Sequence, residues 1–269
     1  MQTSTTTGKG HAALARNAQR TLIGAASIVA LLVAWYVLTD LTGIVTPVQF
    51  PSPTEAWESL DQLLGPGYAD GTLARHVGSS LALVLIGFAV AAGTGVPLGL
   101  LMGVNRLAES FFNPVFQILR PIAPIAWIPL TILWFGLGTP AKIFVIWLAA
   151  FAPAVINTYT GVRNIDPVVV AAARVHGAGR RAILFDVVIP AALPTIFTGL
   201  RLSLQACWMV LVAAELVGSF TGLGHVMIIA TRDLIPGMIF VGMATVAVLG
   251  VLLTMVLAYV ERWVIPWRR

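Results

Sequence analysis

Six apolar segments recur along the chain and are separated by short polar stretches. Each is about 19 residues long or longer, which is enough for an α-helix to cross the hydrocarbon core of a bilayer. The pattern therefore predicts an all-α polytopic membrane protein with a single transmembrane domain over residues 21–269. The six predicted spans are 21–39, 80–104, 111–137, 140–160, 191–217 and 237–260.

The composition agrees with a chain that lies in a bilayer. Hydrophobic residues make up 58% of the 269 residues and charged residues only 10%, whereas soluble domains carry about 25% charged residues. A cleaved signal peptide is the alternative interpretation of the first apolar segment. That segment exceeds the usual signal-peptide core of about 7–15 residues, and no A-x-A site follows it. We therefore predict an uncleaved first span behind a polar cytoplasmic tail, residues 1–20.

Glycine and proline distinguish the second and third spans. The second has Gly95, Gly99 and Gly103 at intervals of four, which put one smooth face along a helix and let a neighbouring helix approach closely. The third span contains four prolines, so we expect a bent or broken helix that lines a cavity rather than lipid. These prolines are Pro114, Pro121, Pro124 and Pro129.

A short helix is predicted on the outer side over residues 51–64. Ser52 is the N-cap, Pro53 follows it, and Glu55 completes a capping box. Its apolar positions fit a helix that lies on the membrane surface, or one that packs on the protein's own loops. The glycine-rich stretch 218–236 is predicted to be an outer loop.

The distribution of lysine and arginine predicts the orientation in the membrane. Eleven of them lie at one set of span ends and three at the other, and the richer side is expected to be cytoplasmic. This topology explains the net charge of +5 without a nucleic-acid partner and places both termini in the cytoplasm. The eleven are Lys9, Arg16, Arg20, Arg106, Arg163, Arg174, Arg180, Arg181, Arg262, Arg268 and Arg269; the three are Arg75, Lys142 and Arg232.

The longest polar interruption, residues 161–190, then lies on the cytoplasmic side. Asp166 is placed to cap a helix, Pro167 suits its first position, and Gly177 suits its C-terminal stop. A second short helix is predicted to start after Gly179. A helical loop of this kind presents a surface to another molecule.

Charged side chains within spans mark candidate pathway residues because they are costly there. Arg120 and Arg201 either give an anion pathway a positive potential or extend to the cytoplasmic interface. Glu215, the one acid within the predicted spans, either gates the pathway or accepts hydrogen bonds from a helix N-terminus. The other pathway candidates are Pro124, Trp127, Asn157, Gln205 and Trp208.

No motif for catalysis stands out in the sequence. H-E-x-x-H, G-x-S-x-G and metal-spaced Cys/His sets are missing, and the segment GKG at 8–10 lacks the rest of a Walker A loop. The chain is therefore not expected to be an enzyme or to hold a metal, and any ATP must be used by another chain. The four dispersed histidines are expected at the surface, and Cys207 is expected to be a packing residue.

The stretch AAARVHGAGRRAILFDVVIPAALP, residues 171–194, resembles the EAA loop of ABC importer permeases. Its matching positions are Ala172, Ala173, Gly177, Ala178, Phe185 and Pro190, whereas Ala171 stands where the motif has glutamate. The segments 50–57, 120–138, 151–166 and 212–224 resemble the nitrate/sulfonate/taurine branch of these permeases. The segments 65–77 and 265–267 look most similar to taurine permeases.

The resemblance implies the architecture of a type I ABC importer permease in a bacterial inner membrane. It implies a homodimer, two cytoplasmic ATPases that bind ATP and magnesium, and a periplasmic or lipid-anchored binding protein. The loop 161–190 would supply coupling helices to the ATPases, with contacts from Gly177, an apolar side and the arginines Arg174, Arg180 and Arg181. The implied solute is a small anion or zwitterion, with taurine or an alkanesulfonate favoured over nitrate or another organic acid.

Two alternatives stay open at this point. A carrier driven by protons or sodium would work alone, and such carriers often show inverted repeats and carboxylates at the membrane midplane. A membrane scaffold without transport activity would also lack catalytic residues.

Overall fold

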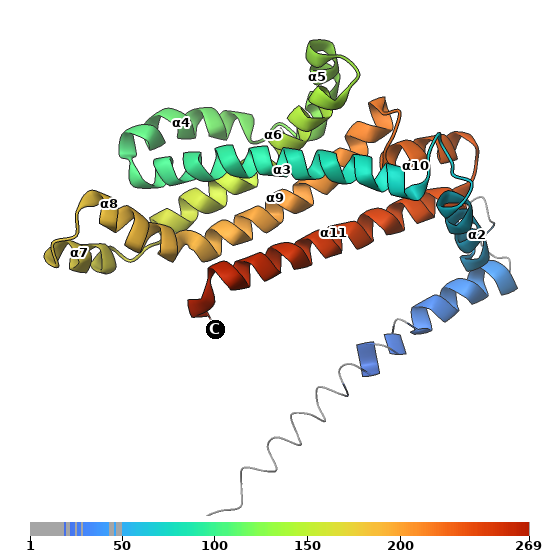
Figure 1. Ribbon diagram of the computed structural model, residues 1–269, viewed down its shortest axis with the longest axis horizontal. Coiled ribbons are helices and arrows are strands. Elements are labelled where there is room, and N and C mark those ends of the chain that lie inside the picture. Colours follow the sequence, from blue (N-terminus) through green and yellow to red (C-terminus); the bar gives the residue numbers. More distant parts are fainter. Residues whose placement is uncertain are drawn as a thin grey trace, which may run out of the picture.

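The computed structural model describes residues 19, 22–24, 26–27, 29–42, 46 and 50–268. Most of the predicted tail, residues 1–20, lies outside the described residues. The described part of the chain contains helices and no strand, as the all-α prediction requires. Four long helices, α3, α6, α9 and α11, run side by side along the molecule (Figure 1). They are α3 (Leu73–Val104), α6 (Thr139–Arg163), α9 (Ile189–Gly218) and α11 (Pro236–Val264).

Six membrane spans are compatible with these helices by length and composition. Leu22–Leu41, which ends in the π-helical turn η1 (Val37–Leu41), and the four long helices are each long and apolar enough to cross a bilayer. The third predicted span is broken: α4 (Arg106–Leu119) is bent by 83° against the segment Pro124–Phe135. That segment consists of the 3-10 turn η2 (Pro124–Trp127) and α5 (Ile128–Phe135). The prediction of a broken helix is therefore confirmed.

The glycine face of α3 packs against α6. A Cβ atom added to Gly95 would lie 2.9 Å from the Cβ of Ala154, and one added to Gly103 would lie 2.6 Å from the Cβ of Val162. Real Cβ atoms do not come this close, so glycine is what allows the two helices to approach. Gly99 also faces α6, where an added Cβ would lie 2.7 Å from the Cβ of Thr158, so all three glycines lie at this helix contact.

The short helix α2 (Pro53–Leu64) begins with the predicted capping box. Glu55 N–H donates to Ser52 Oγ at 3.2 Å, and Ser52 N–H donates to Glu55 Oε2 at 3.0 Å. Its buried side packs against α11 and α10 (Leu223–Arg232), where Leu63 lies among Val226 and Met238. The helix thus packs on the rest of the protein, which is one of the two predicted arrangements.

The structure corrects the prediction for residues 218–236. This stretch is not a loop, because it contains α10, six of whose residues are buried. Its glycines have a packing role, because Gly222 and Gly224 allow the chain to pack directly against Glu215. Gly222 has φ +120°, a left-handed conformation that favours glycine.

The polar loop predicted over residues 161–190 is also shorter in the structure. After α7 (Pro167–Val175), α8 (Arg180–Ala182) continues through the π-helix η3 (Ile183–Val188) directly into α9. The second short helix is therefore the first part of a helical run over Arg180–Gly218, and residue 190 is not a boundary. The π-helical segment lies just before Pro190, where the ordinary helical hydrogen bond is lost.

Candidate functional site

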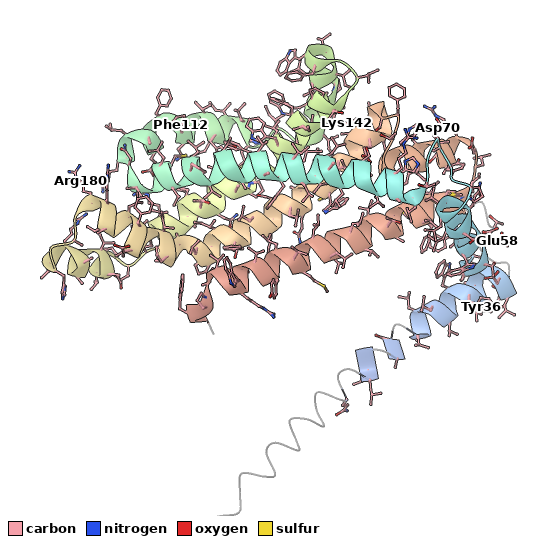
Figure 2. The ribbon with its side chains drawn as sticks, viewed as in Figure 1. Tyr36, Glu58, Asp70, Phe112, Lys142 and Arg180 are labelled. Atoms are coloured by element: carbon pink, nitrogen blue, oxygen red, sulfur yellow. The ribbon has the colours of Figure 1, made fainter. Side chains whose placement is uncertain are left out.

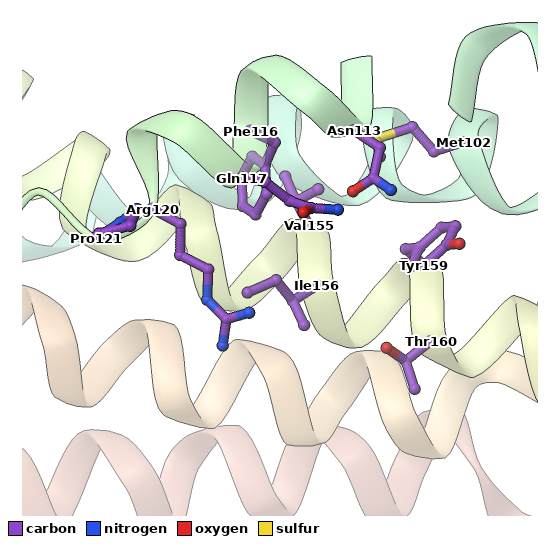
Figure 3. A pocket seen from close by; sticks show the side chains of 10 residues that line it. All are labelled: Met102, Asn113, Phe116, Gln117, Arg120, Pro121, Val155, Ile156, Tyr159 and Thr160. Carbon is purple, nitrogen blue, oxygen red and sulfur yellow. The ribbon is translucent and has the colours of Figure 1, made fainter. Parts of the chain in front are cut away.

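A cavity of about 540 Å³ lies between α4 and α6 (Figure 3). Its upper wall in that view is α4, and its lower wall is the second half of α6. Ten residues line it: Met102, Asn113, Phe116, Gln117, Arg120, Pro121, Val155, Ile156, Tyr159 and Thr160.

The polar side of this cavity is a ladder on α4. Asn113, Gln117 and Arg120 are spaced at i, i+4 and i+7, which places them on one helical face. Figure 3 shows Asn113 and Gln117 above α6, whereas the Arg120 side chain extends down past Ile156. Within the described residues, none of them has a side-chain hydrogen bond or an ion pair. The ladder is therefore available to a molecule in the cavity.

A second cavity of about 610 Å³ adjoins the first and shares Phe116, Arg120 and Ile156 with it. Four more predicted pathway residues line this second cavity: Pro124, Trp127, Asn157 and Gln205. With Arg120, five of the eight candidates therefore line it. The rest of its wall is mainly apolar: Leu119, Ile122, Trp147, Leu148, Ala149, Phe151, Ala152, Pro153, Leu202, Ala206 and Met209.

The other three candidates lie elsewhere. Arg201 forms an ion pair with Glu261 of α11. Trp208 is buried in the main apolar core. Neither residue lines the two cavities. Glu261 also corrects the count of acids, because α11 extends to Val264 and includes this second carboxylate.

Glu215 is buried at the N-terminus of α10. Its carboxylate accepts hydrogen bonds from Ser80 Oγ at 2.8 Å and from Gly224 N–H at 2.8 Å. Ser80 Oγ in turn accepts from Leu223 N–H at 2.9 Å. Leu223 and Gly224 are the first two residues of α10, so these bonds satisfy the backbone N–H groups at its N-terminus. This agrees with the interpretation of Glu215 as an acceptor at a helix N-terminus rather than as a gate.

His76 completes this network, and the structure corrects its predicted place at the surface. Its side chain is buried, Nδ1 accepts from Gly222 N–H at 3.1 Å, and Nε2 lies 3.0 Å from the Tyr68 carbonyl. His225 is also buried, and burial together with nearby His76 lowers the pKa of His225. Within the described residues, no group of His, Cys, Asp and Glu could hold a metal ion. Cys207 is buried in the core, as predicted for a packing residue.

A polar cluster that the sequence did not reveal lies next to Tyr159, which lines the first cavity. Glu109 of α4 pairs with Arg163 at the end of α6, and Tyr159 donates a hydrogen bond to the same carboxylate. The Arg163 guanidinium also lies 5.7 Å from the Tyr159 ring centroid. This cluster joins α4 to α6, and the 54-residue separation of the ion pair explains why no local pattern predicts it.

The predicted coupling loop has the expected caps. The Asp166 carboxylate accepts from Val168 N–H at 2.8 Å, Pro167 is the first residue of α7, and Gly177 has φ +80°. None of the described side chains of α7 is buried. α7 and α8 form one end of the molecule, away from α2 and α10 (Figure 1).

The other residues predicted for the coupling loop lie along α7, α8, η3 and the start of α9. Ala172, Ala173 and Arg174 lie in the last turns of α7, and Ala178 N–H donates to Ala173 O at 3.0 Å. Arg180 and Arg181 lie in α8, Phe185 is exposed on η3, and Pro190 is the second residue of α9. Figure 2 shows Arg180 at the outer edge of this end of the molecule.

A bundle of membrane-spanning helices with a broken third span, a cavity between α4 and α6 and a projecting helical loop defines a membrane transport subunit. Comparisons with known proteins give the particular family. Residues 95–269 match the family described as "Binding-protein-dependent transport system inner membrane component". The chain belongs to this family of ABC importer permeases, within its taurine, sulfonate and nitrate group.

Curated relatives match most of the chain. The chain is 35% identical over 242 residues to the taurine transport system permease protein TauC of Escherichia coli, covering 90% of this chain and 88% of the relative. It is 32% identical to the nitrate import permease protein NrtB of a Synechocystis species, covering 90% and 88%. It is 35% identical to the bicarbonate transport system permease protein CmpB of Synechococcus elongatus, covering 91% and 89%.

A solved structure shows the same fold. The inward-facing MetNI methionine ABC transporter aligns with a TM-score of 0.59 and 23% identity, over 72% of this chain and 94% of the transporter chain. The fold is that of a type I ABC importer permease, as predicted. The protein is thus a multi-pass membrane subunit that works with ATPase subunits and is not itself an enzyme.

Proposed function

We propose that this chain forms the translocation pathway of an ATP-driven importer for a small anionic or zwitterionic solute. The observation that carries the proposal is the projecting helix α7. It is capped at both ends, yet it exposes Val168, Val169 and Val175 instead of burying them. An isolated nine-residue helix is not stable by itself, so a helix with a bare apolar side is suited to a partner groove.

In this proposal the partner at α7 is a cytoplasmic ATPase that binds ATP and magnesium. The lysine and arginine count supports a cytoplasmic location for both termini and for residues 161–190 in a bacterial inner membrane. Two copies of the permease form a homodimer, and a periplasmic or lipid-anchored binding protein delivers the solute to the outer face. The predicted contacts of Gly177, Arg174, Arg180 and Arg181 with the ATPase belong to the same proposal.

Taurine or an alkanesulfonate is the proposed solute. The taurine relative supports it, while the nitrate and bicarbonate relatives keep other small oxyanions as the alternative. A carrier driven by an ion gradient has less support. Its best carboxylate, Glu215, is already engaged by Ser80 and Gly224.

A charged residue introduced on α7 tests the proposed coupling between the permease and the ATPase. Val168 is 69% exposed, and glutamate in the first turn of a helix favours the helix, so Val168→Glu should fold normally. In the complex it would bury an unpaired charge, which we expect to lower uptake and substrate-stimulated ATPase activity by about tenfold. The measurement is uptake by proteoliposomes that contain the permease, the ATPases and the binding protein.

The control is Val168→Thr, which keeps the shape without the charge and should transport nearly normally. Co-purification of the ATPase with each variant shows whether docking itself is lost. Normal uptake by Val168→Glu would contradict the proposed docking surface.

A further inference from the structure

Helix α4 is attached to the rest of the protein at only a few points. Ala108 is the one buried residue among its described side chains, and the large apolar side chains of Phe111 and Ile118 are 70% and 73% exposed. The cavity of about 540 Å³ lies between the polar face of α4 and α6. Because a helix with few buried contacts moves at low cost in free energy, the polar contacts of α4 decide where it lies.

The polar contacts of α4 with α6 come from one cluster of three side chains. The Glu109 carboxylate accepts hydrogen bonds from Arg163 and from the Tyr159 hydroxyl, and Arg163 Nε donates to the same hydroxyl at 3.4 Å. Among the residues that the structure describes, Glu109 is the only α4 side chain that forms an ion pair or a hydrogen bond with another helix. Tyr159 also lines the first cavity, where it lies below α4 in Figure 3.

This cluster lies where α6 leads into α7. Arg163 is the last residue of α6, and only residues 164–166 separate it from Pro167, the first residue of α7. Asn164 N–H donates to Thr160 O at 3.0 Å, which holds the start of this connection against α6. A connection of three residues extends by about 10 Å at most. A larger displacement of α7 therefore draws Arg163 with it.

We infer that Glu109, Tyr159 and Arg163 form a latch through which α7 positions α4, and with it one wall of the first cavity. The latch rests on the proposed function, because there a partner moves α7. With the latch intact, α4 follows the end of α6, so the cavity changes width together with a movement of α7. Without the carboxylate, α4 no longer follows α7, and ATP hydrolysis drives transport less efficiently. The three are positioning residues, because they act on the cavity through α4.

The position of α4 is measured in the permease alone, in nanodiscs. Thr160 lines the first cavity on α6, and the one native cysteine, Cys207, is buried, so Thr160→Cys supplies a single reactive thiol for a methanethiosulfonate reagent. We expect Glu109→Gln to raise the labelling rate about threefold, which is the change in an opening equilibrium when a partly exposed ion pair is lost. Glu58→Gln removes an exposed acid from α2 and should not change the rate. An unchanged rate in Glu109→Gln would overturn the inference.

The effect on transport is measured as solute imported per ATP hydrolysed. The assay uses proteoliposomes with the permease, the ATPases and the binding protein, and taurine, butanesulfonate and nitrate as probes. We expect Glu109→Gln to lower this ratio about threefold. Its Tm should stay close to that of the wild type, because one partly exposed ion pair adds little stability. A wild-type ratio in Glu109→Gln, or a ratio that falls only together with Tm, would also overturn the inference.

Exchange of the two charges separates an ion-pair latch from a simple packing role. The double variant Glu109→Arg/Arg163→Glu should return the labelling rate and the import ratio to within about twofold of the wild type, whereas each single change should not. A double variant as impaired as the single ones would contradict the latch. Failure of the proposed function would appear differently, as wild-type proteoliposomes that import none of the three probes. The labelling rates of the permease alone then decide whether the latch exists.

Discussion

Glu215→Ala is expected to lower the free energy of unfolding by about 3 kcal/mol or more. The carboxylate is fully buried and accepts from the Ser80 hydroxyl and from the Gly224 amide. Alanine would leave both donors buried without an acceptor, and each such donor costs about 1–3 kcal/mol. It would also open space beside Gly222, which packs directly against the carboxylate. The first turn of α10 would therefore lose its attachment to α3 and α9.

Thermal unfolding of the purified permease in detergent measures this effect. A loss of about 3 kcal/mol corresponds to a fall in Tm of roughly 6 °C or more for a chain of this size. Glu215→Gln keeps an acceptor oxygen and should lose less than Glu215→Ala. Glu58→Ala removes an exposed acid from α2, shown at the right of Figure 2, and should leave Tm unchanged. A Glu215→Ala protein with the wild-type Tm would contradict the capping role.

Gly99→Val should prevent α3 and α6 from packing, with an expected loss of several kcal/mol in stability. A Cβ at this position would lie 2.7 Å from the Val155 carbonyl oxygen and 2.7 Å from the Cβ of Thr158. The first of these neighbours is backbone, so it has no rotamer by which to move away. The helices would have to separate along a contact that also includes Gly95 and Gly103.

Gly93→Val is the matched control because it lies on the same helix with open space around its Cβ position. Both variants place a β-branched residue in a helix, so they share any change in helix propensity. The comparison is the yield of monodisperse protein and its Tm after extraction from the membrane. Equal behaviour of the two variants would show that the close approach at Gly99 is not what holds the helices together.

Local sequence patterns predicted those structural features that depend only on residues close together in the chain. The capping box at Ser52 and Glu55 and the cap at Asp166 involve residues within a few positions of each other, and both were predicted. The same holds for the break in the third span, because proline disrupts a helix at its own position.

Contacts between distant segments could not be predicted in this way. The pair of Arg201 and Glu261 joins residues 60 positions apart, and the network of His76 with Gly222 joins residues 146 positions apart. Apolar periodicity identifies a helix but does not say which helix packs beside it. The prediction of a loop over residues 218–236 was wrong for the same reason. Gly222 and Gly224 are needed because they pack against Glu215, a contact that no local pattern indicates.

The continuity of Arg180–Gly218 has a mechanical consequence. Its last 30 residues, α9, form a rod of about 45 Å, and α8 joins this rod through the π-helical segment before Pro190. Because a helix is stiff along its axis, a displacement of the start of α9 is expected to move Glu215, and the first turn of α10 is attached to that carboxylate. The ion pair of Arg201 with Glu261 extends the same movement to α11. α9 thus links the end of the molecule that carries α7 and α8 to the end that carries α10 through one continuous helix (Figure 1).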